Sequence, residues 1–320
     1  MNYRKLGRYG IRVSEVALGG WLTLGRTLDD RASDAVVHKA LEVGINFFDT
    51  ADVYHQGEGE KALGKALKSQ RRESVVIATK CYFPFGEGPN DRGLSRKHIF
   101  ESLHNSLKRL NTDYVDLYQF HRFDEETPVD ESIRAVDDLI RQGKVLYWGV
   151  SEWSAQQIRN AVDLADRLNA NPPASNQPIY HMLNRYIEDE VLPTSEKLGM
   201  GQVVFSPLAQ GVLTGKYLPG QPPPTGTRGA DESSNMFMGN LLKDEVLTRV
   251  QKLKGYLEGQ GLQLAPFALA WCLRQRGVSS VIIGASRPEQ VAINAQASGL
   301  SVEESVFKAA EDILAGESTH

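Results

Sequence analysis

The sequence has little cysteine and no long apolar run. Of its 320 residues only Cys81 and Cys272 are cysteines, too few for a disulfide framework or for a metal site of the cysteine and histidine type. No apolar segment approaches the ~20 residues that a membrane-spanning helix needs. The stretch Met1–Gly7 lacks the apolar run of a secretory signal peptide. We therefore expect a cytoplasmic protein with no metal site and no membrane insertion.

A dominant charge of either sign is also missing. The formal net charge is -4, from 36 Lys and Arg against 40 Asp and Glu, and no basic block stands out. Binding to nucleic acid or to an anionic membrane surface is therefore not indicated. Hydrophobic residues make up 41% of the chain and charged residues 24%. This is the ordinary balance of a globular protein, and it supplies ample material for a core.

A third absence is a Gly-x-Gly-x-x-Gly motif after the first expected strand, which argues against an open dinucleotide-binding sheet. The chain instead repeats one unit: a short apolar run, a polar turn and a helical pattern. After a hairpin expected over residues 1–14, the strands are expected at 16–18, 45–48, 75–79, 115–120, 145–150, 174–177, 203–205 and 281–283. Eight such units predict parallel strands with crossover helices, closed into a (β/α)8 TIM barrel.

Helical patterns follow the strands near residues 34–43, 60–68, 96–109, 130–142, 155–168, 188–198 and from 288 onward. A long insertion follows the seventh strand. Its segment Leu218–Asn240 is rich in Pro, Gly and Ser, which is typical of a mobile loop over the barrel mouth. Ser301–Leu314 is expected to form an extra C-terminal helix outside the barrel. No linker is visible, so residues 1–320 are expected to form a single domain.

Polar side chains follow three successive strands. Asp49 comes directly after Phe47-Phe48 with Tyr54 just beyond, Lys80 ends the third strand, and His121 ends the fourth. A parallel barrel gathers these strand ends on one face. Each residue alone has a structural explanation: Asp49 could cap the next helix with Tyr54 packed on it, and a lone strand-end histidine is more often structural. Four such residues together predict a site for proton chemistry.

The residue types indicate how this site would work. A lysine at a buried strand end needs a counter-charge or its pKa falls, and Asp49 is the candidate partner of Lys80. Lys80 near Tyr54 would lower the tyrosine pKa from its usual ~10. Tyr54 would then be a usable proton donor near neutral pH. His121 could supply a further hydrogen bond or polarise a carbonyl group.

The motifs of these strand ends resemble those of the aldo-keto reductases, and they occur in the same order: Asn46–Tyr54, Ala78–Lys80, Asp116–His121, Gly149–Ser151, Asn176–Gln177, Phe205–Gly211 and Gly284–Ser286. The resemblance runs from about Tyr3 to Leu314. The stretches Gly215–Tyr217, Ala270–Arg274 and Gly277–Val281 resemble the branch that contains the voltage-gated potassium-channel β subunits. The resemblance implies a tetrad of Asp49, Tyr54, Lys80 and His121, with Tyr54 as general acid.

The resemblance also implies a nicotinamide cofactor, NADPH (NADP+). The residues at matching positions would hold the carboxamide (Ser151, Gln177), cover the nicotinamide ring (Phe205), line the pyrophosphate path (Ser206, Leu208, Lys216) and meet the adenosine end (Ser286, Gln290, Asn294). Trp21, Asp49, Pro207, Ala209, Gly211, Arg228, Gly284 and Arg287 complete the expected cofactor-binding set. The chain departs from relatives at Glu152, where many carry Asn or Arg, and at Ile293, which is acidic in the channel subunits.

A preference for NADPH requires cations for its 2′-phosphate. Arg287 directly follows Gly284–Ser286, where the eighth strand meets a helix start. A helix N-terminus and a guanidinium both suit a phosphate. The alternative is that Arg287 is an exposed helix-start residue. Arg228, in the loop over the mouth, is expected to fold over the same region, by resemblance to the channel subunits.

The resemblance implies an NADP-dependent reductase that converts aldehydes or ketones to alcohols by hydride transfer. The first alternative is a redox-sensing, channel-β-like regulatory subunit that binds NADPH with little turnover. His121 argues against it, because the channel subunits carry Asn there. A Schiff-base lyase using Lys80 is a third hypothesis, but it leaves Asp49, Tyr54 and the carboxamide set unexplained. Relatives in this branch often form tetramers or octamers, so a homo-oligomer is possible by analogy.

Overall fold

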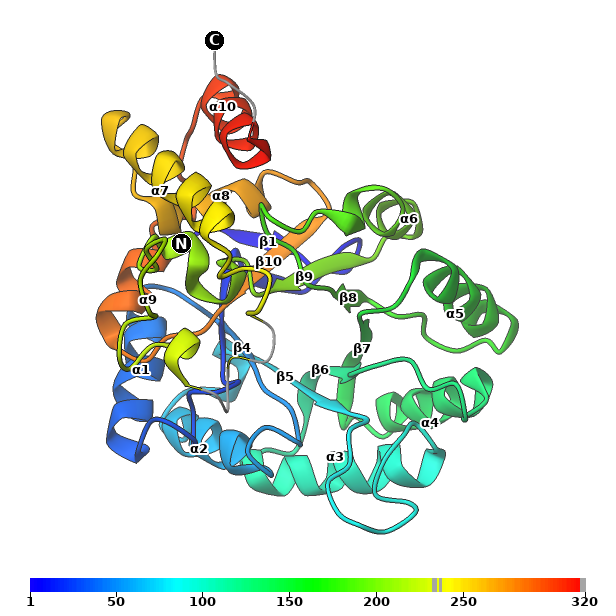
Figure 1. The fold of residues 1–320 in the computed structure, drawn as a ribbon. Helices are drawn as coiled ribbons and strands as arrows, with labels where there is room; N and C mark the ends of the chain where they lie inside the picture. Colours follow the sequence, from blue (N-terminus) through cyan, green and yellow to red (C-terminus); the bar gives the residue numbers. More distant parts are fainter. Residues whose placement is uncertain (232–234, 236–237, 317–320) are drawn as a thin grey trace.

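The structure, a computed structural model, describes residues 1–231, 235 and 238–316. Eight parallel strands close into a barrel in the order β10-β3-β4-β5-β6-β7-β8-β9, and helices surround it (Figure 1). The barrel strands are β3 (Val16–Gly19), β4 (Phe47–Asp49), β5 (Val76–Cys81), β6 (Val115–Phe120), β7 (Val145–Ser151), β8 (Ser175–Gln177), β9 (Gly201–Phe205) and β10 (Val278–Ile283). The predicted (β/α)8 TIM barrel is confirmed.

The helices outside the barrel are α1 (Asp30–Glu42), α2 (Glu58–Leu67), α3 (Arg96–Leu110), α4 (Val129–Arg141), α5 (Ala155–Arg167), α6 (Val191–Leu198), α7 (Asp244–Gly259), α8 (Leu264–Leu273), α9 (Pro288–Ala295) and α10 (Glu304–Ala315). Several start where a short polar side chain caps them. Asp29 accepts from the amide of Ala32 at α1. Ser154 and Gln157 form a reciprocal capping box at α5. The caps explain why these helices begin where they do.

The predicted hairpin is present as β1 (Tyr3–Lys5) and β2 (Arg12–Ser14), paired antiparallel. It closes the amino-terminal end of the barrel. Gly7 lies at φ 58° against the start of β9, where an added Cβ would be 2.2 Å from the carbonyl oxygen of Gly199, so only glycine fits there. The hairpin residues Leu6 and Val13 are buried with inward-facing strand residues such as Phe47 and Leu117. The barrel interior is therefore filled from this end, and a functional site is left to the carboxyl ends of the strands.

A second apolar layer lies between the strands and the surrounding helices. Helix α8 belongs to it completely: every residue from Leu264 to Leu273 except Ala265 is buried. Neither α7 nor α8 was predicted within the long insertion. Because α8 is apolar on all sides, it has no polar face from which a helical period could be recognised. The expected C-terminal helix is confirmed as α10, which packs against α7 outside the barrel (Figure 1).

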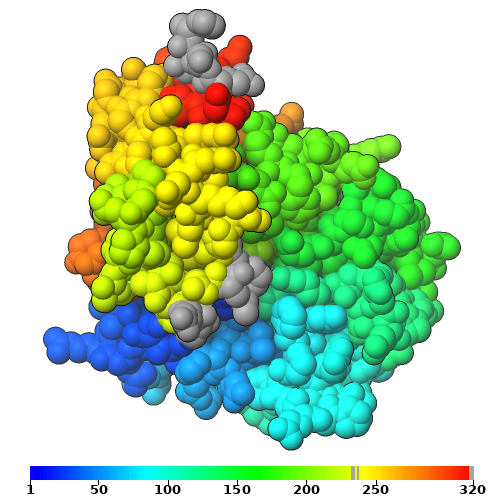
Figure 2. Space-filling model, in the orientation of Figure 1, coloured from blue at the N-terminus to red at the C-terminus, as the bar shows by residue number. Residues whose placement is uncertain are grey.

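The segment expected to cover the barrel mouth, Leu218–Asn240, is described in part. It contains a short 3-10 helix, η4 (Arg228–Ala230), while residues 232–234 and 236–237 lie outside the described residues. In Figure 2 the described part, yellow-green to yellow, spreads over the face of the molecule between the blue N-terminal and green central regions. Its location agrees with the prediction, and its mobility remains a prediction.

Among the helices of the described residues, none is long and apolar enough to cross a membrane.

Candidate active site

The four residues of the predicted tetrad lie together at the carboxyl end of the barrel. The Nζ atom of Lys80 is 2.5 Å from Oδ1 of Asp49 and 3.4 Å from the hydroxyl of Tyr54. The rings of Tyr54 and His121 are 5.7 Å apart, edge to face. The register of the strands places them there, because Asp49 pairs with Ala78 on β5 and Cys81 pairs with Phe120 on β6.

A short turn after β4 brings Tyr54 back toward Lys80. Thr50 and Asp52 continue the ladder by donating their amides to the carbonyls of Ala78 and Lys80. His55 and Gln56 then adopt left-handed φ angles of 49° and 50°, a conformation that non-glycine residues rarely adopt. Gly57, at φ 84°, starts α2. Strained backbone of this kind is common where a structure holds a functional side chain in place.

Lys80 is completely buried and donates to three oxygen atoms. They belong to Asp49 (2.5 Å), the carbonyl of Thr50 (2.7 Å) and Tyr54 (3.4 Å). Burial by itself would lower the pKa of Lys80, but Asp49 and Tyr54 outweigh it and the pKa is raised. The expectation that Asp49 is the counter-charge of Lys80 is confirmed by this geometry. Lys80 is therefore a cation with its three protons engaged.

The expected lowering of the Tyr54 pKa is wrong. Burial of the phenol raises the pKa above its usual value, and Asp49 adds to the rise. Lys80 acts in the predicted direction but does not outweigh these effects, because its charge is largely compensated by Asp49 at 2.5 Å. The phenol is thus protonated at neutral pH, which is the form that a proton donor requires.

His121 is a neutral imidazole in this environment. Burial, Lys80 and Arg122 together hold the pKa of His121 well below its usual value. Its Nδ1 atom is buried without a hydrogen-bond partner among the described residues. The ring of Phe83 packs edge-on against it, 4.8 Å away. A neutral imidazole beside a phenol offers one N–H donor to a carbonyl oxygen held between them.

Two buried glutamines complete the surroundings of Asp49. Its Oδ2 atom accepts from Nε2 of Gln177 (2.8 Å) and from Nε2 of Gln119 (3.3 Å). Gln119 was not predicted from the sequence. Strand alternation could have found it, since Leu117 is an interior residue and Gln119 and His121 follow it on the same face of β6. The amides hold Asp49 in place on the side opposite Lys80.

Ser151 and Gln177 lie side by side as neighbours in the β7–β8 register. The hydroxyl of Ser151 donates its proton to the carbonyl of Gln177, 2.8 Å away. Its oxygen is therefore left as an acceptor, which Arg122 Nη1 approaches at 3.4 Å. Glu152, the departure noted after Ser151, has a φ of 59° and turns away to accept from the amide of Ile179.

The loop after β9 has an unusual backbone. Ser206, Ala209, Gln210 and Gly211 all have positive φ angles, of 54°, 48°, 58° and 92°. The amides of Ala209 and Gly211 donate to the carbonyls of Ser206 and Leu208 within the loop, at 2.8 and 2.9 Å. Lys216 reaches back to this loop, where its Nζ lies 3.1 Å from the position of a Cβ added to Gly211. The loop therefore has a cation held beside it, which a pyrophosphate site needs.

Gln210 joins two of the predicted cofactor residues, although it was not predicted itself. It donates to Ser206 (2.6 Å) and accepts from Arg228. The Arg228 guanidinium lies over the ring of Trp21, 5.3 Å from its centroid. Arg228 is thus placed beside the loops after β3 and β9. That Arg228 folds over the region of Arg287 stays a prediction.

At the start of α9 the predicted adenosine residues form a small exposed group. Gln290 accepts from both the amide (2.8 Å) and the hydroxyl (3.2 Å) of Ser286. Arg287 is the N-cap residue of α9, and its side chain is exposed. Asn294 is buried on the same helix. Gly284 is exposed and has open space at its Cβ position.

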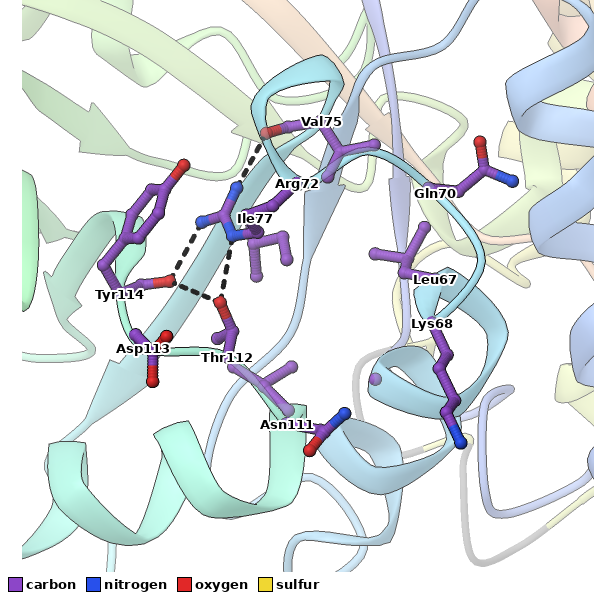
Figure 3. A pocket seen from close by; sticks show the side chains of 12 residues that line it. Leu67, Lys68, Gln70, Arg72, Val75, Ile77, Asn111, Thr112, Asp113 and Tyr114 are labelled. Carbon is purple, nitrogen blue, oxygen red and sulfur yellow. Dashed lines mark hydrogen bonds between the residues drawn. The ribbon is translucent and has the colours of Figure 1, made fainter.

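A cavity of about 230 Å³ lies elsewhere, at the amino ends of β5 and β6 and the ends of α2 and α3 (Figure 3). Arg72 spans it and donates to the carbonyls of Val75 and Tyr114 and to the hydroxyl of Thr112. No tetrad residue lines this cavity. Its side chains tie β5 to β6 at the end of the barrel opposite the tetrad, which is a structural role.

Behind the Tyr54 turn lies a buried acid that the sequence did not single out. Asp52 accepts from the hydroxyl of Ser102 on α3 (2.7 Å) and from the amide of Val53 (2.6 Å). Burial raises its pKa to about 7, with a further contribution from Glu60, although Ser102 opposes the rise. Asp52 therefore fixes the base of the turn to α3 and changes charge near neutral pH.

This raised pKa makes stability depend on pH in a defined direction. In the unfolded chain Asp52 ionises near 3.8, and in the folded chain near 7. Between these values the folded state binds more protons, so stability falls as pH rises. Asp52→Asn should therefore gain stability relative to the wild type between pH 4 and 7, by up to ~4 kcal/mol at about 1.4 kcal/mol per pKa unit.

Urea unfolding of both proteins at pH 5 and pH 8 measures this difference. Asp163→Asn, at an exposed position of α5, is the control for the charge change alone. The Asp52 difference should grow between the two pH values while the Asp163 difference stays level. An Asp52 difference that is the same at both pH values would contradict the raised pKa.

The chain can now be compared with known proteins. Residues 15–315 match the model of the aldo/keto reductase family. A protein of Oryza sativa subsp. japonica named "Probable voltage-gated potassium channel subunit beta" is 44% identical over 300 residues, which is 93% of this chain and 91% of that protein. A protein of the same name from Arabidopsis thaliana gives the same identity and coverage. With a barrel that carries the tetrad at its carboxyl end, and with these matches over nearly its whole length, the chain belongs to the aldo/keto reductase family of oxidoreductases.

Proposed function

We propose that the protein is an NADPH-dependent reductase of aldehydes and ketones. The observation that carries the proposal is the buried arrangement of a protonated Tyr54, a cationic Lys80 paired with Asp49, and a neutral His121. A phenol with its proton, a cation against its oxygen and an N–H donor beside it are the groups that reduction of a carbonyl to an alcohol requires. When bound, NADPH supplies the hydride for the carbonyl carbon.

Each residue of the tetrad has a separate task. Tyr54 donates its proton to the carbonyl oxygen as negative charge develops there. Lys80, 3.4 Å from the phenol oxygen, stabilises the phenolate that remains. His121 donates a hydrogen bond to the same carbonyl oxygen. Asp49 keeps Lys80 charged and aligned and is itself held by the amides of Gln119 and Gln177.

The free acceptors of the site fit a carboxamide. The Ser151 hydroxyl donates a hydrogen bond to the backbone carbonyl of Gln177, and the side-chain amide of Gln177 donates one to Asp49. Gln177 Oε1 has no donor among the described residues, and Ser151 Oγ accepts only the long contact of Arg122 Nη1 at 3.4 Å. A primary amide has two N–H donors for these two oxygens. The cation of Lys216, which lies against Gly211 in the loop after β9, suits a pyrophosphate. These observations support the expected order of nicotinamide and phosphate sites.

A panel of aldehydes and ketones, followed by oxidation of NADPH, tests the proposal. We expect turnover of one or more carbonyl compounds at roughly 1–10³ s⁻¹, the ordinary range for enzymes. Tight NADPH binding with no turnover of any compound would contradict it. A Schiff-base reaction at Lys80 is not supported, because an amine must lose its charge to attack a carbonyl and the pKa of Lys80 is raised.

The second candidate is a regulatory subunit, which the names of the relatives favour. His121→Asn separates it from the reductase. We expect the hydride-transfer rate to fall by roughly 10-fold or more, because Asn presents its donor from a shorter side chain and oxyanion donors depend on position. Cofactor affinity should change little. Single-turnover oxidation of bound NADPH measures the rate, and an unchanged rate would remove His121 from the reaction.

Arg287 is the residue proposed to recognise the 2′-phosphate. Arg287 is the N-cap residue of α9 by its backbone position, beside Ser286, and its side chain is exposed. A phosphate bound there would meet a positive helix end. Arg287→Ala should weaken NADPH by ~1.5–3 kcal/mol, the range for hydrogen bonds to charged groups. NADH affinity should barely change. Titration of both cofactors against Arg287→Ala and against Arg276→Ala, an exposed arginine just before β10, gives the comparison. Equal losses for both cofactors at Arg287 would exclude phosphate recognition.

A further inference from the structure

Arg122 directly follows His121 and holds its guanidinium at the edge of the site. Its Nη1 atom donates to the backbone carbonyl of His121 (2.5 Å) and approaches Ser151 Oγ (3.4 Å). Its Cζ atom is 5.5 Å from the centroid of the Phe83 ring, the ring that packs on His121. The arginine is half-buried. None of the predicted roles accounts for this position.

The charge of Arg122 has no carboxylate partner. Within the described residues its hydrogen bonds go to two uncharged oxygens, and no acidic group lies within 4.0 Å. The acid nearest along the chain to Ser151, Glu152, is engaged with the amide of Ile179 and the hydroxyl of Tyr186. By contrast, the half-buried Arg72 and Arg109 pair with Asp116 and Glu60 at 2.6 Å. A partly desolvated guanidinium usually has such a partner.

The field of Arg122 reaches the groups that would handle the carbonyl. It acts to lower the pKa of both Tyr54 and His121. Phe83 provides an apolar surface between Arg122 and His121, 4.8 Å from the imidazole ring. A ligand seated with its carbonyl oxygen at Tyr54 and His121 would therefore pass along Phe83, with its far end near the guanidinium.

We propose that Arg122 is a specificity residue that binds a carboxylate on the carbonyl substrate, so that the preferred substrates are aldehydes or ketones carrying an acid group. This inference rests on the proposed reductase function and deepens it. Within the part of the chain that the structure describes, Nε and Nη2 have no hydrogen-bond partner, so they can make the paired hydrogen bonds that a carboxylate accepts. Phe83 packs against the apolar body that joins the carboxylate to the carbonyl group. The arginine thus gains in the complex the acidic partner that it lacks in the free protein.

The test compares two substrates that differ only in charge, 4-carboxybenzaldehyde and its methyl ester, with NADPH as reductant. In the wild type kcat/KM should favour the acid by about 10-fold or more, since a charge-assisted pair contributes at least that factor. In Arg122→Gln the ratio should fall to about one, mainly through a higher KM for the acid. Arg122→Lys should keep part of the preference. Arg134→Gln, which removes an exposed charge from α4, should keep all of it.

The outcomes separate this inference from the function on which it rests. If the wild type reduces acid and ester equally well, the reductase stands and the role of Arg122 is overturned. The same holds if the ratio survives in Arg122→Gln. If neither aldehyde is reduced, the proposed function fails for this class of substrate. The carboxylate site is then tested by the binding of benzoate to the NADPH-loaded protein. Binding that is about 10-fold tighter in the wild type than in Arg122→Gln supports the site, and equal binding overturns it. Should Arg122→Gln fail to fold, loss of the wild-type preference for the acid in high salt supports an ionic contact, and a salt-independent ratio overturns it.

Discussion

Tyr54→Phe is expected to lower carbonyl reduction by at least ~10²-fold, the lower end of the effect of a general acid. The substitution removes the one hydroxyl that lies against Lys80, at 3.4 Å, and leaves the aromatic ring in place. No other protonated phenol contacts Lys80 among the described residues, so the carbonyl oxygen would have to take its proton from water. Because the ring still packs on His121, the site should keep its shape.

The measurement pairs turnover with cofactor fluorescence on the same protein. NADPH binding should survive in Tyr54→Phe, because the proposed cofactor contacts are made by other residues. Tyr256→Phe, which removes a hydroxyl from the outer helix α7, serves as the matched control and should behave as the wild type. Near-wild-type turnover in Tyr54→Phe would show that another group protonates the oxygen. Loss of both turnover and cofactor binding would indicate a structural role for the hydroxyl.

The geometry of the tetrad was predictable because it depends on strand order. Once Asp49, Lys80 and His121 are assigned to the ends of successive strands, a parallel barrel has to bring them to one face. The direction of the Tyr54 pKa was not predictable in the same way. It depends on how completely the phenol is buried and on the short distance between Asp49 and Lys80, and neither can be read from the sequence.

Other parts of the site were missed for related reasons. Gln119 was missed because the sequence does not show which group a glutamine within an apolar strand will contact. Its alternation with Leu117 and His121 nevertheless placed it inside the barrel. The contacts of Gln210 depend on a loop in which several residues have left-handed φ angles. Most of these residues are not glycine, so the sequence does not indicate this conformation. Arg228 is still only predicted to lie near the cofactor path, and its position over Trp21 depends on the fold of the Pro-rich segment. Loop contacts of this kind follow from tertiary packing.

The buried pair Asp49–Lys80 gives the largest expected effect on stability. The two side chains are 4% and 0% exposed, and their charged atoms are 2.5 Å apart. Removal of one partner leaves an uncompensated charge in the interior. This typically lowers the free energy of unfolding by roughly 3–5 kcal/mol. We therefore expect losses of about this size for Asp49→Asn and for Lys80→Met. Lys80→Met should be the milder of the two, since Asp49 keeps the amides of Gln119 and Gln177.

The double variant Asp49→Asn/Lys80→Met distinguishes an ion pair from two independent contributions. With both charges gone no unpaired charge is left in the interior, so its stability should be closer to that of the wild type than either single variant is. Urea unfolding of the four proteins completes the cycle, and losses that simply add would mean that the two charges do not depend on each other. Activity should follow a different pattern: the double variant should be as inactive as Lys80→Met, because it has no cation to stabilise the Tyr54 phenolate. Recovered stability without recovered turnover would show that the pair is maintained for its effect on Tyr54 and contributes little to the fold.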